Sequence, residues 1–163
     1  MKKMRIAVAL IALLLCGCGS EETLETVADE ILQPVSAQMH QIYLELPSAA
    51  ASPTVESGAD RLYQCDTYDI WIQTLTGGDL EATVRTVSGY AQDNLTVIHT
   101  VRNGWDCYEF VWASAGEGGD QVGRAMILDD GSYHYCVSVL GDADSAVENQ
   151  VYWEEMFRSF ALA

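Results

Sequence analysis

Histidine and cysteine are the side chains of this sequence best suited to catalysis or metal binding. The three histidines, His40, His99 and His134, are far apart in the sequence and form no HExxH or HxH motif for a metal. His134 and Cys136 alternate along a predicted strand and therefore share one face. A Cys/His pair can act as nucleophile and base, but residues two apart on a strand need not interact. The pattern favours a structural role, so we expect no catalytic residue and no metal ligand here.

The cysteine count limits disulfide bonding. Of the five cysteines, Cys16 belongs to the predicted signal peptide and Cys18 fits the lipidation motif described below, which leaves Cys65, Cys107 and Cys136. Three cysteines permit at most one intramolecular disulfide. All three lie in predicted strands, where a free cysteine commonly packs as a small hydrophobic residue. No CxxC motif indicates redox catalysis. If a disulfide forms, Cys107 with Cys136 is the first candidate, because both belong to the last set of antiparallel strands.

Four acidic residues in and after a glycine-rich segment form a candidate cation site. Glu117, Asp120, Asp129 and Asp130 carry the oxygen ligands that hard cations prefer, but their spacing does not match an EF-hand loop. The segment 115–123 lacks the phosphate-loop motif and has no lysine, and its carboxylates would repel phosphate. A solvated hairpin loop is the alternative that we prefer, and no cofactor is indicated.

The first 17 residues have the form of a secretory signal peptide. Basic residues precede ten apolar residues, 6–15, which are too few to span a hydrocarbon core about 30 Å thick. The following segment, Leu15-Cys16-Gly17-Cys18, resembles the lipobox of bacterial lipoproteins. In that family the cysteine is diacylglycerylated and the peptide before it is removed, which implies lipidation of Cys18. The alternative is a plain secretory signal with incidental cysteines.

The charge of the processed chain restricts its partners. Residues 18–163 keep five arginines and no lysine against 24 acidic residues, a net charge near −19. Such a field disfavours binding to nucleic acid and to anionic lipid headgroups. The lipid would therefore hold the protein at the extracytoplasmic face of the cell membrane, and stable anchoring requires more than one acyl chain.

The elements that must position these residues divide the chain into two parts. Residues 18–38 are acidic and predict a lipidated tether or a short helix, and residues 39–163 predict one α+β domain. We expect helices or long loops on both faces of its antiparallel sheet, because several strands are apolar on both sides. The expected strands are 40–46, 62–66, 68–75, 94–101, 105–112, 122–128 and 133–140, the expected helices begin at Asp79 and at about Ser145, and the expected loops are 47–58 and 113–119.

The order of these elements resembles the superfamily of the photosystem II protein PsbP, which includes DcrB-like bacterial lipoproteins. The shared order is a first strand ending in Leu46-Pro47, a long loop, two strands, a helix, four antiparallel strands and a closing helix ending in the segment 156–160 (MFRSF). The resemblance covers residues 39 onward and implies a sheet of about six to seven strands in an α/β/α sandwich. That superfamily has no shared catalytic residues, so the resemblance implies an accessory or assembly role.

Three classes of function remain open from the sequence. The first is a non-catalytic interaction or assembly module of the cell envelope, which binds another envelope protein and which the resemblance favours. The second is a lipoprotein that binds a small ligand or a cation. The third is an enzyme, for which the sequence offers no catalytic constellation. Aromatic residues left exposed would mark a binding groove, and the candidates are Tyr63, Tyr68, Trp71, Trp105, Trp112, Tyr133 and Tyr135.

We expect Cys18→Ser to release the protein from membranes or to leave its precursor unprocessed, because the thiol that accepts the lipid is lost. Metabolic labelling with an alkynyl fatty acid measures this directly, and Cys16→Ser is the matched control. Equal labelling of Cys18→Ser and the unaltered chain would contradict the assignment.

Overall fold

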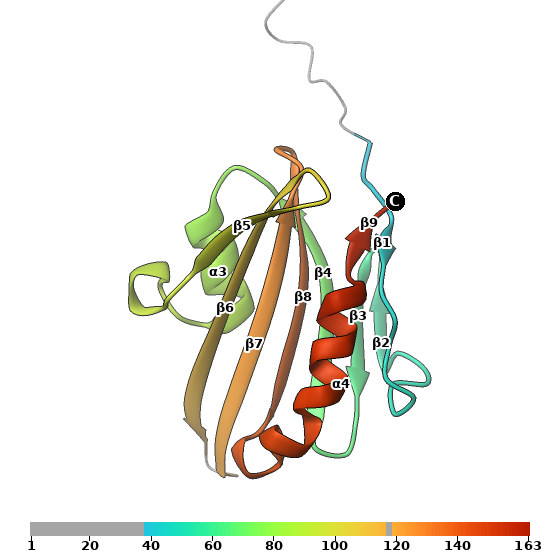
Figure 1. Ribbon diagram of the computed structural model, residues 1–163, viewed down its shortest axis with the longest axis vertical. Coiled ribbons are helices and arrows are strands. Elements are labelled where there is room, and N and C mark those ends of the chain that lie inside the picture. The colour runs from blue at the N-terminus through green and yellow to red at the C-terminus, as the bar shows by residue number, and fades with distance from the viewer. Residues whose placement is uncertain (1–37, 117–118) are drawn as a thin grey trace, which may run out of the picture. The chain divides into compact units, whose positions relative to one another are not determined.

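The computed structural model describes residues 38–116 and 119–163, so the predicted signal peptide, Cys18 and nearly all of the predicted tether lie outside the described residues. Within the described ranges, no helix is long and apolar enough to cross a membrane. The elements are β1 (Ile42–Tyr43), β2 (Val55–Ser57), β3 (Asp60–Gln64), β4 (Tyr68–Thr76), α3 (Leu80–Ser88), η1 (Gln92–Asn94), β5 (Ile98–Arg102), β6 (Trp105–Gly116), β7 (Gly119–Asp129), β8 (Tyr133–Asp142), η2 (Ala143–Ser145), α4 (Ala146–Ser159) and β9 (Ala161–Leu162) (Figure 1).

Seven of the strands form one antiparallel sheet in the order β2-β3-β4-β8-β7-β6-β5. Strands β1 and β9 form a separate two-stranded antiparallel sheet. The predicted α+β class, with an antiparallel sheet of six to seven strands and helices packed on it, is confirmed. The order of the major elements is also the order that the resemblance to the PsbP/DcrB-like superfamily implied.

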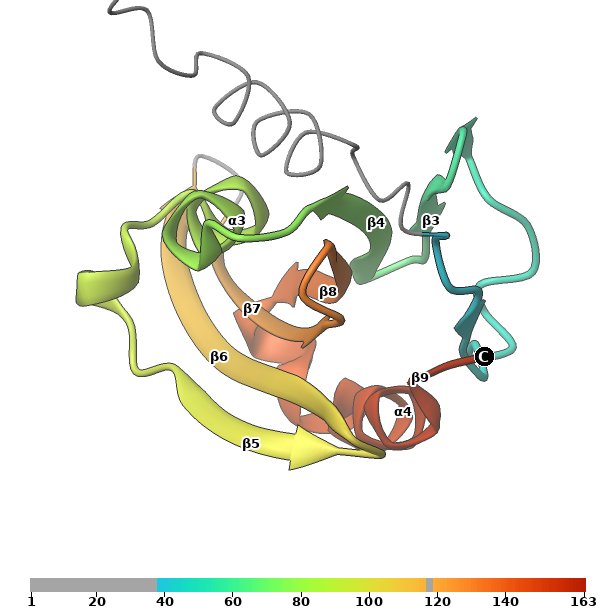
Figure 2. The same ribbon diagram turned by 90° about the horizontal axis from the view of Figure 1, so that it is seen from above.

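The large sheet is covered by one helix on each face, α4 on one side and α3 on the other (Figure 2). Alternation along β7 explains the two layers, because successive side chains point to opposite faces. Met126 and Leu128 join the larger core with Met156 and Phe157 of α4. Ala125 and Ile127 join the smaller core with Val84 of α3.

Short-range sequence signals place two features of the fold correctly. The pair Asn103-Gly104 turns β5 into β6 with φ angles of 52° and 89°, the left-handed region that a tight hairpin requires. Asp79 caps α3, since its side chain accepts a hydrogen bond from the Ala82 N–H at 2.9 Å.

The predicted loop 113–119 is wrong over most of its length. Strand β6 continues to Gly116 and β7 begins at Gly119, with Ala113 paired to Val122 and Ala115 paired to Asp120. The alanine, serine and glycine residues of this segment have low intrinsic preference for strands. Pairing with a long neighbouring strand outweighs that preference, since strand propensity depends strongly on context.

Strand β1 is shorter than the predicted strand 40–46, and its partner is the C-terminus. Ile42 pairs with Leu162 and Tyr43 with Ala161, while Gln41 and Ala163 exchange backbone hydrogen bonds of 3.1 and 2.9 Å. Residues at opposite ends of the chain make this ladder. No local pattern predicts it, because each strand has only two residues.

Candidate functional site

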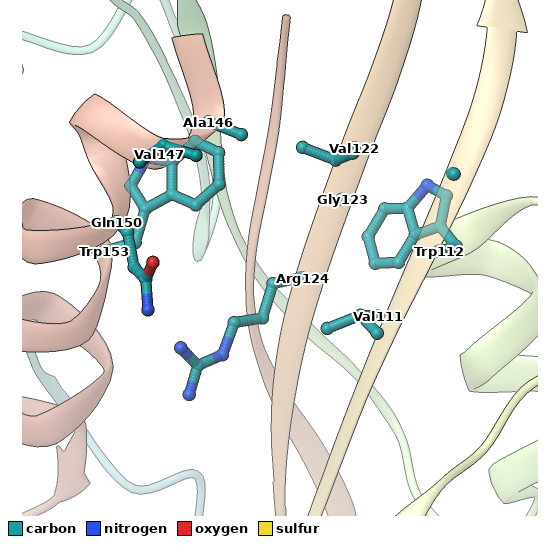
Figure 3. Close-up of a pocket in the computed structure, with 10 residues that line it drawn as sticks. Val111, Trp112, Val122, Gly123, Arg124, Ala146, Val147, Gln150 and Trp153 are labelled. Carbon is teal, nitrogen blue, oxygen red and sulfur yellow. The ribbon is translucent and has the colours of Figure 1, made fainter. Parts of the chain in front are cut away.

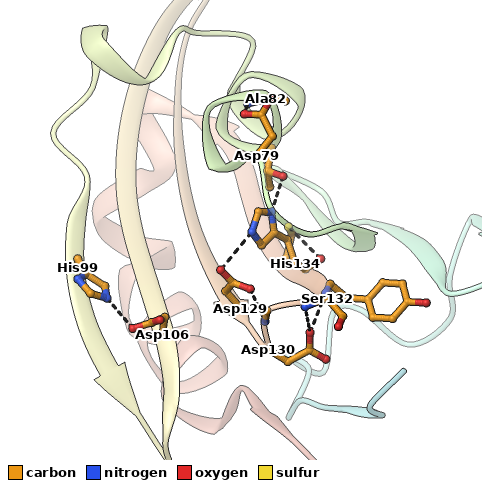
Figure 4. Close-up of polar contacts among 12 residues, drawn as sticks. Asp79, Ala82, His99, Asp106, Asp129, Asp130, Ser132 and His134 are labelled. Carbon is orange, nitrogen blue, oxygen red and sulfur yellow. Dashed lines mark hydrogen bonds and ion pairs between the residues drawn. The ribbon is translucent and has the colours of Figure 1, made fainter. Parts of the chain in front are cut away.

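A buried hydroxyl–imidazole–carboxylate series joins α3 to the sheet. Thr83 Oγ1 lies 2.7 Å from His134 Nδ1, and His134 Nε2 lies 3.4 Å from Asp129 Oδ2 (Figure 4). These are the groups of a hydrolase triad. However, Thr83 is 3% exposed and His134 is 1% exposed, so a substrate cannot reach the hydroxyl. The series therefore attaches the helix to the sheet and does not form a catalytic site.

The predicted candidate disulfide between Cys107 and Cys136 is wrong. Cys107 of β6 is paired with Leu128 of β7 and belongs to the core under α4. Cys136 is paired with Ile127, the neighbouring residue of β7, and belongs to the core under α3. The two thiols thus lie on opposite faces of the sheet. Burial raises the pKa of the Cys136 thiol, which disfavours a nucleophilic thiolate.

The four acidic residues predicted as a cation site do not come together. Asp120 lies near the first residue of β7, whereas Asp129 is its last residue and Asp130 follows it. Nine residues of extended chain separate Asp120 from Asp129 by about 30 Å. Glu117 lies outside the described residues. Among the residues that the structure describes, no group of three or more His, Cys, Asp or Glu side chains could hold a metal ion.

Asp130 instead organises the turn between β7 and β8. Its Oδ1 accepts the N–H groups of Ser132 and Tyr133 (Figure 4). Its Oδ2 accepts the Tyr135 hydroxyl at 2.8 Å. Burial raises the pKa of Asp130, but these hydrogen bonds and the nearby His40 outweigh it, so the pKa lies below its ordinary value. Burial and the Asp130 carboxylate raise the pKa of Tyr135 to about 12, so its hydroxyl remains a donor. The same hydroxyl accepts the His40 N–H at 2.8 Å.

An open apolar groove lies between α4 and strands β6 and β7, and it is the strongest candidate for a functional site. Its volume is about 550 Å³ (Figure 3). Val111 contributes from β6, Val122 and Arg124 from β7, and Val147 and Trp153 from α4. Val147 is 80% exposed and Val111 is 63% exposed. Two large aliphatic side chains therefore face solvent beside a concave apolar surface, which is the usual character of a contact site.

One polar side chain gives the groove directional chemistry. The indole N–H of Trp153 has no hydrogen-bond partner within residues 38–116 and 119–163, but it is buried and faces no open space of the groove. Arg124 reaches from β7 toward α4 (Figure 3). Its Nη2 pairs with Glu109 Oε2 at 3.2 Å, and its guanidinium lies 4.7 Å from the centre of the Phe157 ring. A bound group could take a hydrogen bond from an arginine whose position is already fixed.

Beyond Arg124 the groove meets a second, charged hollow of about 260 Å³. Arg102, on β5, donates from Nη1 to the Phe157 carbonyl at 2.8 Å and from Nη2 to the Arg158 carbonyl. These carbonyls belong to the last turn of α4, where a cation is favourable next to the helix dipole. Arg102 therefore fixes the end of α4 against the sheet and lines the second hollow.

Of the aromatic residues that the sequence singled out, Trp112 lines the groove. The Trp112 ring packs on Gly123, where an added Cβ would lie 2.1 Å from the ring. Tyr63, Tyr68 and Tyr135 are buried, and Trp71 is 37% exposed on β4. Sequence reasoning missed Val147 and Val111, which are aliphatic. The sequence did carry a sign that Val147 is exposed, because this valine lies outside the apolar stripe of the closing helix.

Comparisons with known proteins show a likeness of fold to one solved structure with a TM-score above 0.5. No protein-family model matches the sequence, and no curated protein matches it. A crystal structure from Bacteroides thetaiotaomicron gives a TM-score of 0.51 at 14% identity, over 75% of this chain and 45% of that one, so this chain spans less than half of that protein. A Pseudomonas aeruginosa protein of unknown function gives 0.44 at 15% identity, over 74% of this chain and 82% of its own. Cyanobacterial PsbP from Synechocystis gives 0.45 at 7% identity, over 78% and 96%.

We expect Asp130→Ala to lower the free energy of unfolding at pH 7 by about 1–3 kcal/mol, because three donors lose their acceptor. Stability supplied by a carboxylate with a lowered pKa is complete above the ordinary Asp value, near 3.9, and is lost as the pH falls through the folded-state pKa. The difference between Asp130→Ala and the unaltered chain should therefore shrink toward pH 2. Urea unfolding at several pH values measures it, with exposed Asp120→Ala as the control. A difference that does not change with pH would contradict the role given to the charge.

Proposed function

We propose that this protein is a lipid-anchored, non-catalytic interaction module of the bacterial cell envelope, and that the groove beside α4 is its contact surface. The observation that carries the proposal is the exposure of Val147 and Val111 at that groove. Leaving such side chains in water gives up about 1.5–3 kcal/mol each relative to full burial. A bound partner would recover that free energy.

The chemistry of the reactive groups supports a non-catalytic role. Thr83, His134 and Cys136 are the hydroxyl, imidazole and thiol with the most suggestive neighbours, and all three are almost completely buried. None of them lines the groove. The groove itself combines aliphatic side chains with an arginine that already has an ionic partner, which suits recognition better than proton transfer.

The proposed location rests on the sequence. The segment ending at Cys18 supplies the anchor, and the acidic tether up to residue 38 would place the domain away from the lipid surface. A partner would then be another envelope protein that reaches the same side of the membrane.

A small-molecule ligand in the same groove is the second candidate. Its volume of about 550 Å³ lies within the usual range of ligand sites, roughly 300–1,000 Å³. The Arg124 guanidinium, which is partly exposed, would suit a ligand with one acceptor group on an apolar body. The proposed partner protein and this ligand would compete for the same surface.

We expect Val147→Asp to abolish partner binding while leaving the fold intact, because its side chain is mostly in water already. A photo-crosslinking amino acid at Gln150, in cells with the native anchor, should give a discrete protein adduct that falls at least about fivefold in Val147→Asp. Val55→Asp is the matched control, since Val55 is an exposed valine on the opposite edge of the sheet.

Native mass spectrometry of the purified protein distinguishes the two candidates. A bound small molecule that Val147→Asp removes, together with the absence of a protein adduct, would replace the interaction module with the ligand-binding alternative. An adduct with unchanged yield in Val147→Asp would move the contact surface away from the groove.

A further inference from the structure

The outer edge of β6 is only partly paired. Strand β5 pairs with β6 from Trp105 to Glu109. The pairing ends at Glu109, whose partner is Ile98, the first residue of β5. In the described part of the chain no strand pairs with that edge beyond Glu109, although β6 continues and remains paired to β7 on its other side. Figure 1 shows this half of β6 at the border of the sheet. Residues 110–115 therefore form an open strand edge.

The direction of the backbone groups along this edge follows from one hydrogen bond. The Tyr90 hydroxyl donates to the Ala113 carbonyl at 3.0 Å, so this carbonyl points away from β7. In an antiparallel strand the N–H and C=O of a residue point to the same side and alternate along the chain. Val111, Ala113 and Ala115 therefore present their N–H and C=O groups outward.

Apart from the Tyr90 hydroxyl on the Ala113 carbonyl, this edge lacks the features that normally prevent strand pairing. Segment 110–115 has the sequence FVWASA, with no charged residue and no proline, whereas natural edge strands are usually protected by charge, proline, a bulge or shortness. The other edges of the sheet are different. Strand β2 has three residues and an Arg61–Glu56 ion pair beside it, and β5 carries the His99–Asp106 contact.

The open edge and the apolar groove are parts of one surface. Val111 belongs to the edge by its backbone and lines the groove by its side chain, and Ala113 does the same. A strand added beside residues 110–115 would place every second side chain on the same face as Val111 and Ala113, at the border of the groove. Backbone pairing would supply affinity and the groove would select the apolar side chains, as in other cases of strand addition.

We propose that this surface binds an extended segment of a partner protein, in which apolar residues alternate with lysine or arginine, by adding a strand to β6. This rests on the proposed function and specifies its partner. The charge of the protein points to a basic segment, because the formal net charge is −16 and the exposed Asp120 is paired with Ala115 at the end of the open edge. A second copy of this chain would bring two strongly acidic surfaces together, which like-charge repulsion disfavours.

The test uses the full chain in detergent and a synthetic peptide of alternating lysine and valine, with alternating glutamate and valine as the charge control. We expect the basic peptide to slow hydrogen exchange at Val111, Ala113 and Ala115 and to bind at least about tenfold more tightly than the acidic peptide. Ala113→Pro should abolish binding, because proline removes an outward N–H without breaking the ladder with β7. Val101→Pro makes the same change on β5 and should have no effect.

Tyr90→Phe tests the same edge through a gain of binding, which a misfolded variant would not show. It frees the Ala113 carbonyl for a partner strand and should tighten peptide binding. The proposal would be overturned if the basic peptide did not bind, if Ala113→Pro did not change its binding, or if hydrogen exchange were slowed at another edge.

Two further results would also decide against it. If the unaltered chain formed a dimer in sedimentation and Ala113→Pro dissociated that dimer, the partner would be a second copy of this chain. Loss of the cellular crosslink in Val147→Asp, with full crosslinking in Ala113→Pro, would reject strand addition and leave the interaction module standing.

Discussion

The structure depends on the burial of β8 on both faces. Residues 134–139 of this strand are all buried, so one face contributes Tyr135, Val137 and Val139 to the core under α4 and the other contributes to the core under α3. Each fully buried side chain of this size contributes about 1.5–3 kcal/mol to folding. A strand in this position needs strands on both sides and a covering element on both faces. The central place of β8 and the two-sided packing of the domain follow from that requirement.

The polar groups of β8 then position the surrounding elements. A buried polar group without a partner is costly, so His134 on one face requires the Thr83 hydroxyl and the Asp129 carboxylate, and these fix α3. On the other face the Tyr135 hydroxyl contacts Asp130 and the backbone of His40, which fixes the first described residues against the sheet. The groups that resemble catalytic machinery thus satisfy hydrogen-bonding needs that the burial of one strand creates.

The groove arises because a single helix is narrower than the sheet beneath it. Helix α4 lines one side of the groove, from Ala146 to Trp153, and strands β6 and β7 line the other side. The sheet continues past the helix, and β5 ends before it reaches the same region. The exposed valines and the open strand edge therefore have one geometric origin.

The sequence by itself determined the local features: the turn at Asn103-Gly104, the cap at Asp79, strands that are apolar on both sides, and the closing helix. These features depend on residues close together in the chain, whose chemistry acts before any tertiary contact forms. Only the tertiary structure decided that segment 113–116 is strand, that Cys107 and Cys136 lie on opposite faces, and that the groove beside α4 stays open. Those outcomes depend on strand register and on the relative lengths of packed elements, and a shift of one residue in register reverses the face of every side chain.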